Sequence, residues 1–174
     1  KTVSSLVSKK IVGWFQGSCE WGSRALGNRS IIANPKIKNM KEILNTKIKK
    51  RESFRPFAPS VLREEANNWF ENYFDDPFMM TVCKVVKSKV EIIPSVTHVD
   101  NSARIQIVSE ESNKKYYSLI KNFFHVSKCP ILLNTSFNEN EPIVCSPTDA
   151  ISTFLKTEID ILVMENFVLT RTEN

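Results

Sequence analysis

Short apolar runs of strand length alternate along the chain with segments in which apolar residues recur at helical spacing. The strand-like runs cover residues 10–17, 30–33, 59–62, 79–86, 102–108, 129–133, 159–164 and 167–170. Helical spacing is found over 39–48, 64–70, 114–126 and 147–155, the last with Ser146 as N-cap and Pro147 in its first turn. This alternation, without an internal repeat, predicts one α/β domain with a mixed sheet. Residues 87–95 are the most linker-like part but mark no domain boundary.

Composition narrows the class of protein. Of the 174 residues, 41% are hydrophobic and 25% charged, as in globular proteins, and no apolar run approaches the roughly 20 residues that span a bilayer. The first residues are too polar for a signal peptide, so we expect a cytoplasmic protein without a membrane partner. The net charge of +5 favours anionic ligands without identifying nucleic acid. Because the chain lacks an initial Met and opens within an amphipathic helical pattern, we expect a piece of a longer protein.

Cysteine and histidine are few and scattered. The four cysteines form no Cys-x-x-Cys pair and have no histidine at ligand spacing. This pattern favours reduced thiols over disulfides or zinc, with Cys83 and Cys129 buried in apolar runs. His98 and Asp100 are minor catalytic candidates, and no metal site is expected in this chain.

Positive charge gathers in one short segment. Residues 49–55 hold four cations, and the apolar run Pro56-Phe57-Ala58-Pro59 follows them at once. Cations that complement the C-terminal end of the preceding helix would account for Lys49 and its lysine neighbours, but not for Arg55, which stands between Phe54 and Pro56. We expect a pocket for a polyanion such as a nucleotide or an acyl phosphate.

A glycine-framed loop and a polar strand end supply further candidates. In residues 20–30 two glycines frame Arg24, and Arg29 and Ser30 follow, which gives a donor-rich turn for an anion or, alternatively, a solvated surface loop. Residues 134–138 (Asn-Thr-Ser-Phe-Asn) follow an apolar run, and they either contact a ligand beyond a strand end or form a turn that bonds only its own backbone. Arg104 lies on a half-buried strand and needs a partner. No P-loop, Rossmann or α/β-hydrolase motif is present.

These motifs in this order, together with residues 98–106 and 140–144, resemble the C-terminal domain of the NodU/CmcH-type O-carbamoyltransferases from about Val7 to Leu169. The resemblance implies a YrdC-like fold, an open twisted mixed sheet flanked by helices in a single domain. It implies binding of carbamoyl phosphate and of ATP, which enters with Mg²⁺ as a substrate, and formation of carbamoyl-adenylate. The actin/hexokinase-like N-terminal domain, which performs the transfer to a hydroxyl and carries the family's metal ion, is then absent from this chain and is its expected partner.

Carried over by motif, the resemblance assigns roles to ten residues. The implied catalytic residues are Lys49, Arg55, Arg104 and Arg24. The residues implied to bind substrate or nucleotide are Arg51, Asn134, Ser136, Asn138, Arg29 and Ser30. Four positions depart from the family pattern: serine replaces proline at 23 and 53, and asparagine replaces glycine at 101 and 140. Asparagine tolerates a left-handed turn, whereas loss of the prolines loosens the loops beside Arg24 and Arg55.

Two other functions remain open on the sequence. The alternatives are a non-catalytic module that binds a nucleotide or an RNA backbone, and a degenerate domain that only braces its partner. The lack of a basic strand interleaved with aromatic residues argues against RNA, so no nucleic-acid partner is expected. A catalytic pocket is expected to select ATP with carbamoyl phosphate, whereas an RNA surface is expected to show a steep salt dependence.

Overall fold

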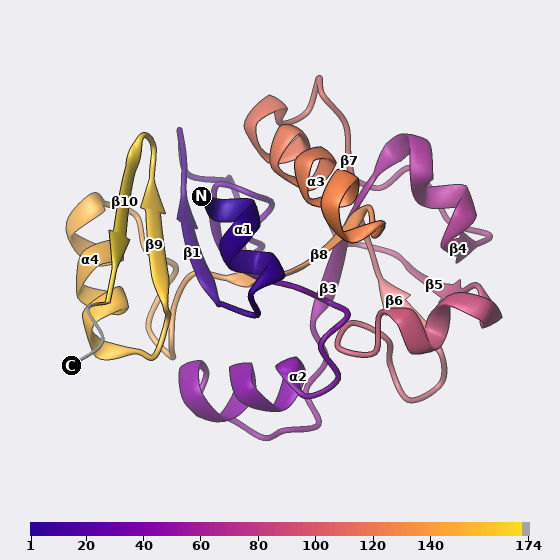
Figure 1. The fold of residues 1–174 in the computed structure, drawn as a ribbon, viewed down its shortest axis with the longest axis horizontal. Helices are drawn as coiled ribbons and strands as arrows, with labels where there is room; N and C mark the ends of the chain where they lie inside the picture. The colour runs from indigo at the N-terminus through magenta and orange to yellow at the C-terminus, as the bar shows by residue number, and fades with distance from the viewer. Residues whose placement is uncertain (172–174) are drawn as a thin grey trace.

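Seven strands form the main sheet, in the order β10-β9-β1-β2-β8-β3-β7 (Figure 1). The computed structural model describes residues 1–171. The strands of this sheet are β1 (Val12–Phe15), β2 (Arg29–Ala33), β3 (Ala58–Leu62), β7 (Gln106–Val108), β8 (Ile131–Ser136), β9 (Ile161–Met164) and β10 (Phe167–Thr170). β1 is parallel to β9 and β3 to β7, whereas the other neighbours are antiparallel, so the predicted mixed sheet is confirmed.

The apolar runs of the sequence become the central strands. Every residue of β1, β2 and β3 is buried, the pattern expected of strands covered on both faces. β10, at the edge of the sheet, is exposed or half-buried along its length. α1 (Thr2–Val7) packs on α3 (Lys114–Ser127), and both contact the sheet, while α4 (Pro147–Lys156) packs on β1 and β9.

A second sheet lies at the end of the molecule away from β10 (Figure 1). It contains β4 (Phe70–Glu71), β5 (Val82–Val85) and β6 (Ser102–Arg104). The sequence predicted one strand over residues 102–108, and this is wrong, because these residues form two strands that belong to different sheets. Residues 102–104 pair with β5 and residues 106–108 pair with β3, with Ile105 fully buried between them. The division places Arg104 where the two sheets meet.

Local capping explains where two helices begin. The Ser146 side chain accepts a hydrogen bond from Asp149 N, and the Asp149 carboxylate accepts one from Ser146 N, with Pro147 as the first helical residue. This capping box confirms the predicted start of α4. α3 starts after Asn113, whose side chain accepts from Tyr116 N, and ends at Lys128, which has a φ of 58°.

Three segments differ from their predictions. Only Met40–Ile43 of the predicted helix 39–48 is α-helical (α2), and the chain continues as a π-helix, η1 (Leu44–Ile48). The predicted helix 64–70 is the 3₁₀ helix η2 (Arg63–Asn68) followed by β4. The predicted linker 87–95 is wrong, because it forms the 3₁₀ helix η3 (Lys87–Ile92) and then buries Ile93 fully. No helix of residues 1–171 is long and apolar enough to cross a membrane.

Candidate functional site

Four arginines from three separate parts of the sequence line one groove. Its two adjoining parts share Arg51 and Arg104; Arg24 from the β1–β2 loop lines one part and Arg55 the other. The wall also includes Pro56 and Phe57, together with Ala58, Met79, Val82, His98, Asn134, Thr135 and Ser136. We call this the arginine groove. No Asp or Glu of residues 1–171 lines it, so its electrostatic character is that of an anion site.

The cations of the groove act on one another. Burial lowers the pKa of Arg104, and the nearby charge of Arg24 lowers it further. Burial likewise lowers the pKa of Arg51, with a further contribution from Arg55. The side chains of Arg24 and Arg104 have no hydrogen-bond or ion-pair partner within residues 1–171, whereas the Arg55 side chain pairs with Glu52 at 3.1 Å. A bound anion would relieve this repulsion and would supply the missing acceptors.

Asn45 positions one side of the groove, and sequence reasoning missed it. Its side chain is fully buried in η1 and accepts a hydrogen bond from Arg51 Nε at 2.8 Å. It donates to the carbonyl oxygens of Ser53 at 3.2 Å and Arg55 at 3.0 Å. Asn45 thus joins Arg51 to the segment that carries Arg55, and the Arg51 guanidinium lies 5.0 Å from the ring centroid of Phe57. A polar residue on the apolar side of a helical pattern was the available signal.

Lys49 is buried and bonds to the end of β8 rather than lining the groove. Its side chain is 2% exposed, and its Nζ donates to Ser136 O at 2.7 Å and to Asn138 O at 2.8 Å. The same ammonium donates to Asn138 Oδ1 at 2.6 Å, and Ser136 Oγ donates to that oxygen at 2.7 Å. Lys49 therefore holds the segment after Ser136 in place, and its expected direct contact with phosphate stays a prediction.

The hold of Lys49 on this segment is expected to depend on pH. Burial, with a smaller contribution from the charge of Arg51, lowers the pKa of Lys49 to about 7. Below that pH the ammonium donates to all its partners; above it the neutral amine has one N–H fewer and donates more weakly. Burial lowers the pKa of His98 from its ordinary value, away from that of Lys49. We expect the backbone amide resonances of Ser136 and Asn138 to titrate with a midpoint near pH 7.

Two lysine variants test this assignment. Lys49→Met should abolish the transition near pH 7. Lys50→Met should retain it, because Lys50 is exposed and pairs with Glu139 at 2.7 Å. A transition that persists in Lys49→Met would assign the titration to another group.

The polar end of β8 is part of a buried network. Asn134 is 1% exposed, and its Nδ2 donates to Ala25 O at 3.0 Å, Ser60 Oγ at 3.1 Å and Gln106 Oε1 at 3.0 Å. Ser60 Oγ in turn donates to Gln106 Oε1 at 2.6 Å. Asn134 Oδ1 has no partner in the described chain. The sequence predicted a loop at residues 134–136, which is wrong because they continue β8, but Asn134 and Ser136 do line the groove.

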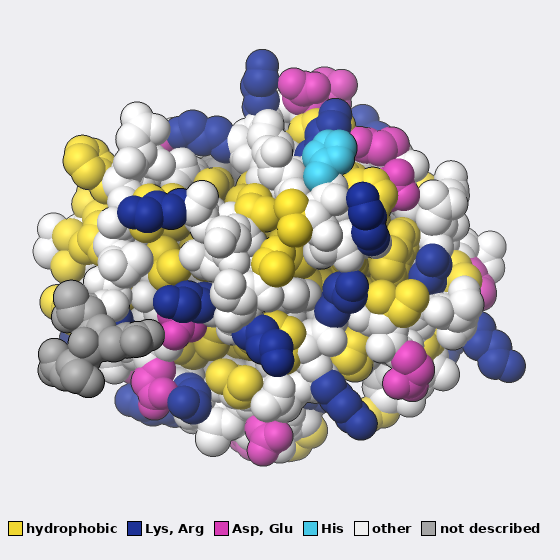
Figure 2. Space-filling model, in the orientation of Figure 1, with side chains coloured by type: hydrophobic (Ala, Val, Ile, Leu, Met, Phe, Trp, Pro, Cys, Tyr) yellow, Lys and Arg dark blue, Asp and Glu magenta, His cyan; other side chains and the backbone are white. Residues whose placement is uncertain are grey.

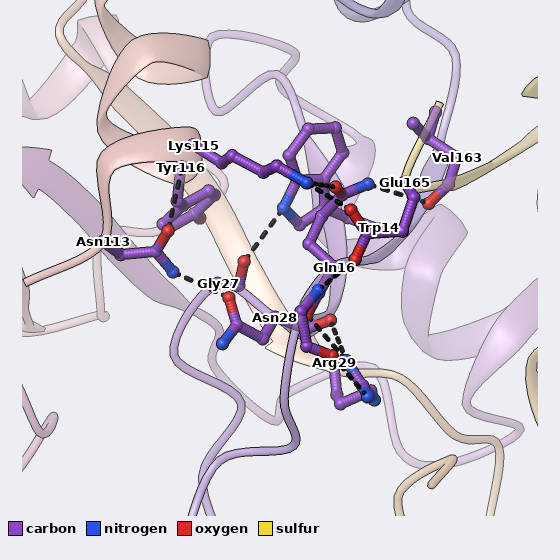
Figure 3. A network of polar contacts seen from close by, with 11 residues as sticks. Trp14, Gln16, Gly27, Asn28, Arg29, Asn113, Lys115, Tyr116, Val163 and Glu165 are labelled. Carbon is purple, nitrogen blue, oxygen red and sulfur yellow. Dashed lines mark hydrogen bonds and ion pairs between the residues drawn. The ribbon is translucent and has the colours of Figure 1, made fainter. Parts of the chain in front are cut away.

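Arg29 and Ser30, predicted as ligand-binding residues, lie outside the groove lining. Arg29 Nη1 donates to Gln16 O at 2.8 Å (Figure 3). Its Nη2 donates to Gly17 O at 3.0 Å, and the guanidinium lies 3.6 Å from the ring centroid of Phe15. Ser30 is fully buried, and its Oγ accepts from Gly27 N at 3.1 Å. Backbone carbonyls thus accept from the two Arg29 Nη groups that were expected to face a ligand, while Nε is buried without a partner in residues 1–171. Both residues hold the base of the loop that carries Arg24.

Glu20 organises the same loop from within and was also missed by the sequence analysis. Its Oε1 accepts from Leu26 N at 2.8 Å, Asn28 N at 2.6 Å and Arg29 N at 3.3 Å. Glu20→Ala removes this shared acceptor and is expected to destabilise the protein by about 1–3 kcal/mol. The amides of residues 26, 28 and 29 should then exchange with solvent faster, as measured by hydrogen exchange.

A matched glutamate separates this effect from loss of charge. Glu71 is exposed on β4, so Glu71→Ala should leave the three amides unchanged. Equal exchange rates in Glu20→Ala and in the unmodified protein would show that the loop does not depend on Glu20.

Comparison with known proteins identifies the family to which the chain belongs. The carbamoyltransferase C-terminus family model matches residues 3–171. The chain is 47% identical, over 99% of its length, to the uncharacterized protein sll1178 of Synechocystis sp., and covers 31% of that protein. It is 48% identical to nodulation protein NolO of Bradyrhizobium diazoefficiens, over 91% of this chain and 30% of that one. It is 39% identical to the 3'-hydroxymethylcephem-O-carbamoyltransferase of Streptomyces clavuligerus, over 79% of this chain and 26% of the enzyme.

A solved structure shares the fold. Full-length HypF, in its phosphate- and nucleotide-bound form, superposes with a TM-score of 0.64 over 95% of this chain and 24% of that one, at 17% identity. The expected YrdC-like α/β fold is therefore confirmed. The chain spans about a quarter to a third of the length of the curated relatives named above. Since the family model covers nearly all of its residues, the chain belongs to the carbamoyltransferase C-terminus family.

Proposed function

We propose that this chain is the activating domain of an O-carbamoyltransferase, which binds ATP and carbamoyl phosphate and forms carbamoyl-adenylate. The observation that carries the proposal is the arginine groove, which four arginines and, within residues 1–171, no carboxylate line; only Arg55 is paired, with Glu52 beside the groove. Both substrates are phosphates, and forked guanidinium donors match phosphate oxygens. Membership of the carbamoyltransferase family is the reason to propose that the group which becomes activated is a carbamoyl group. Mg²⁺ would enter on the ATP phosphates, because the groove offers it no carboxylate.

We assign a different role to each part of the groove. Arg51 and Arg55 would neutralise the phosphates, with Arg51 held by Asn45. Arg24 and Arg104 would stabilise the charge that develops as water cleaves carbamoyl phosphate to carbamate and inorganic phosphate, and a carbamate oxygen then bonds the α-phosphorus of ATP while pyrophosphate leaves. Asn134 offers an unpartnered buried oxygen, which could accept a hydrogen bond from the carbamoyl amide. Catalysis would then rest on positioning and electrostatics rather than on a covalent enzyme intermediate.

Transfer to an acceptor hydroxyl would take place elsewhere in a longer protein. The chain covers only a fraction of its relatives, so we propose that an N-terminal domain holds the acceptor and the family's metal ion. The domain by itself should form carbamoyl-adenylate without carbamoylating an acceptor. Addition of the purified N-terminal domain should restore transfer.

The decisive experiment is a direct search for the adenylate. The folded chain is incubated with MgATP and carbamoyl phosphate, and pyrophosphate release and carbamoyl-adenylate are followed by mass spectrometry. Pyrophosphate should appear only when both substrates are present. A folded sample that binds neither substrate would favour a bracing role for this domain.

Binding to RNA is a weaker alternative. Figure 2 shows Lys and Arg side chains spread singly over the viewed face rather than gathered into a continuous patch. The groove cations instead converge from distant segments on one small site. Binding of RNA that weakens steeply with salt, without selectivity for ATP, would overturn the proposed activity.

A further inference from the structure

One methionine in the wall of the arginine groove has a backbone conformation that is uncommon outside glycine. Met79 has a φ of 57°, in the left-handed region that side chains other than those of Asn and Asp rarely occupy. Its side chain is 4% exposed, whereas those of Phe78 and Met80 are 61% and 75% exposed. Of these three consecutive apolar residues, only the one with the strained backbone is buried. Such strain persists only where the surrounding structure holds it, and it is found most often at functional sites.

A buried carboxylate holds this backbone conformation. Asp76 Oδ1 accepts a hydrogen bond from Phe78 N at 2.8 Å, and its Oδ2 accepts one from Met80 N at 2.7 Å. Thr81 donates twice to the same Oδ2, from its N at 2.7 Å and from its Oγ1 at 2.9 Å. Ile107 N of β7 donates to Asp76 O at 2.8 Å. The turn of residues 77–81 is therefore tied to the main sheet, with hydrogen bonds on both sides of Met79.

Met79 lines the smaller of the two parts of the arginine groove. That part, which also contains Arg24 and Asn134, has a cavity of about 120 Å³, whereas the adjoining part with Arg55 measures about 300 Å³. A buried water needs about 10–15 Å³, so the smaller part has room for roughly ten non-hydrogen ligand atoms, the scale of carbamoyl phosphate. The Met79 side chain thus restricts the space at the end of the groove where an acyl group could reach Asn134.

We propose that Met79 is a specificity-determining residue that limits the acyl group of a bound acyl phosphate to the size of a carbamoyl group. This role rests on the proposed function, because it takes an acyl phosphate as the ligand of this part of the groove. With the phosphate held by the arginines, a longer acyl chain would have to displace the Met79 side chain. The hydrogen bonds to Asp76 oppose that displacement, since they fix the backbone before and after Met79.

Two acyl phosphates that differ only in chain length test this role. Acetyl phosphate has a methyl group in place of the carbamoyl amino group, and butyryl phosphate extends that methyl by two methylene groups. Titration calorimetry measures the binding of carbamoyl, acetyl and butyryl phosphate to the folded chain. The unmodified chain should bind acetyl phosphate about tenfold or more tightly than butyryl phosphate, because even one extra methylene is selected against to this extent. Met79→Ala should remove most of this preference through a gain in affinity for butyryl phosphate.

Two further variants separate selectivity from folding. Met80→Ala should leave all three affinities unchanged, because the Met80 side chain is exposed and its contact with Asp76 is made by the backbone N. Met79→Gly also removes the side chain, and glycine adopts a φ of 57° without strain. It should therefore lose the same selectivity even if Met79→Ala folds poorly.

The possible failures are distinguishable. Binding of carbamoyl phosphate with an unchanged preference for acetyl over butyryl phosphate in folded Met79→Gly would overturn the role of Met79 and leave the proposed function standing. Equal affinities for acetyl and butyryl phosphate in the unmodified chain would do the same. If the unmodified chain bound none of the three ligands, the proposed function would be wrong, and the role of Met79 with it.

Discussion

Arg104→Gln is expected to weaken binding of MgATP and carbamoyl phosphate by about 2 kcal/mol, roughly 30-fold, without lowering the stability of the fold. The affinity falls because glutamine cannot offer a charged donor to a phosphate. Stability is maintained because the Arg104 side chain has no partner among the described residues and is repelled by Arg24, while its backbone pairing with β5 does not depend on the side chain. Titration calorimetry measures the first effect and thermal unfolding the second.

Two outcomes distinguish this role from a structural one. Arg63→Gln serves as the control, because Arg63 is exposed, lies outside the groove and pairs with Asp75 at 3.2 Å. Its replacement should leave both affinities unchanged. If Arg104→Gln instead lowered the unfolding temperature and left binding intact, Arg104 would be a structural residue and the anion site would lie elsewhere.

Gly27→Ala is expected to destabilise the protein by about 3–5 kcal/mol, combining overpacking with an unfavourable backbone conformation. A Cβ at this position would lie 2.3 Å from Cδ1 of Tyr116, whose side chain is fully buried and cannot move aside. Gly27 also has a φ of 110° and is held by Trp14 Nε1, which donates to its carbonyl oxygen at 2.9 Å (Figure 3). Urea unfolding measures the loss.

Gly22 offers a matched comparison in the same loop. Its φ is 117°, but a Cβ there would meet nothing within 4 Å. Gly22→Ala should therefore cost only the backbone strain, about 1–2 kcal/mol. Equal losses for the two variants would show that strain, rather than the contact with Tyr116, limits position 27.

Much of the fold could be predicted because its determinants are local. The apolar runs of β1, β3 and β9 show their burial in a few consecutive letters, and the start of α4 is encoded by Ser146, Pro147 and Asp149 within four positions. The second sheet could not be predicted, because residues 102–108 alternate as one strand does. Only the positions of β5 and β3 decide that the chain changes sheets at Ile105.

The candidate site was likewise predictable from the sequence only in part. Clustered charge beside a rigid apolar segment identified Arg51 and Arg55, and both line the groove, as do Arg24, Arg104, Asn134 and Ser136. The direction of each side chain was not encoded locally. Arg29 and Lys49 carry the same charge as the groove arginines, yet oxygens of other residues accept from them: the Gln16 and Gly17 carbonyls from Arg29, and Ser136 and Asn138 from Lys49. Asn45 and Glu20 escaped notice because a single polar residue in a helix or loop has many possible roles.

The sequence by itself determined the α/β class, most strands and helices, the family resemblance and the segments that contain the anion site. Those properties follow from periodicity, capping and residue type, which act over a few neighbouring positions. The tertiary structure alone decided which cations face the groove and which ones brace it. Such pairings depend on which strands become neighbours, and the burial of a polar group is stable only where the whole fold supplies its partners.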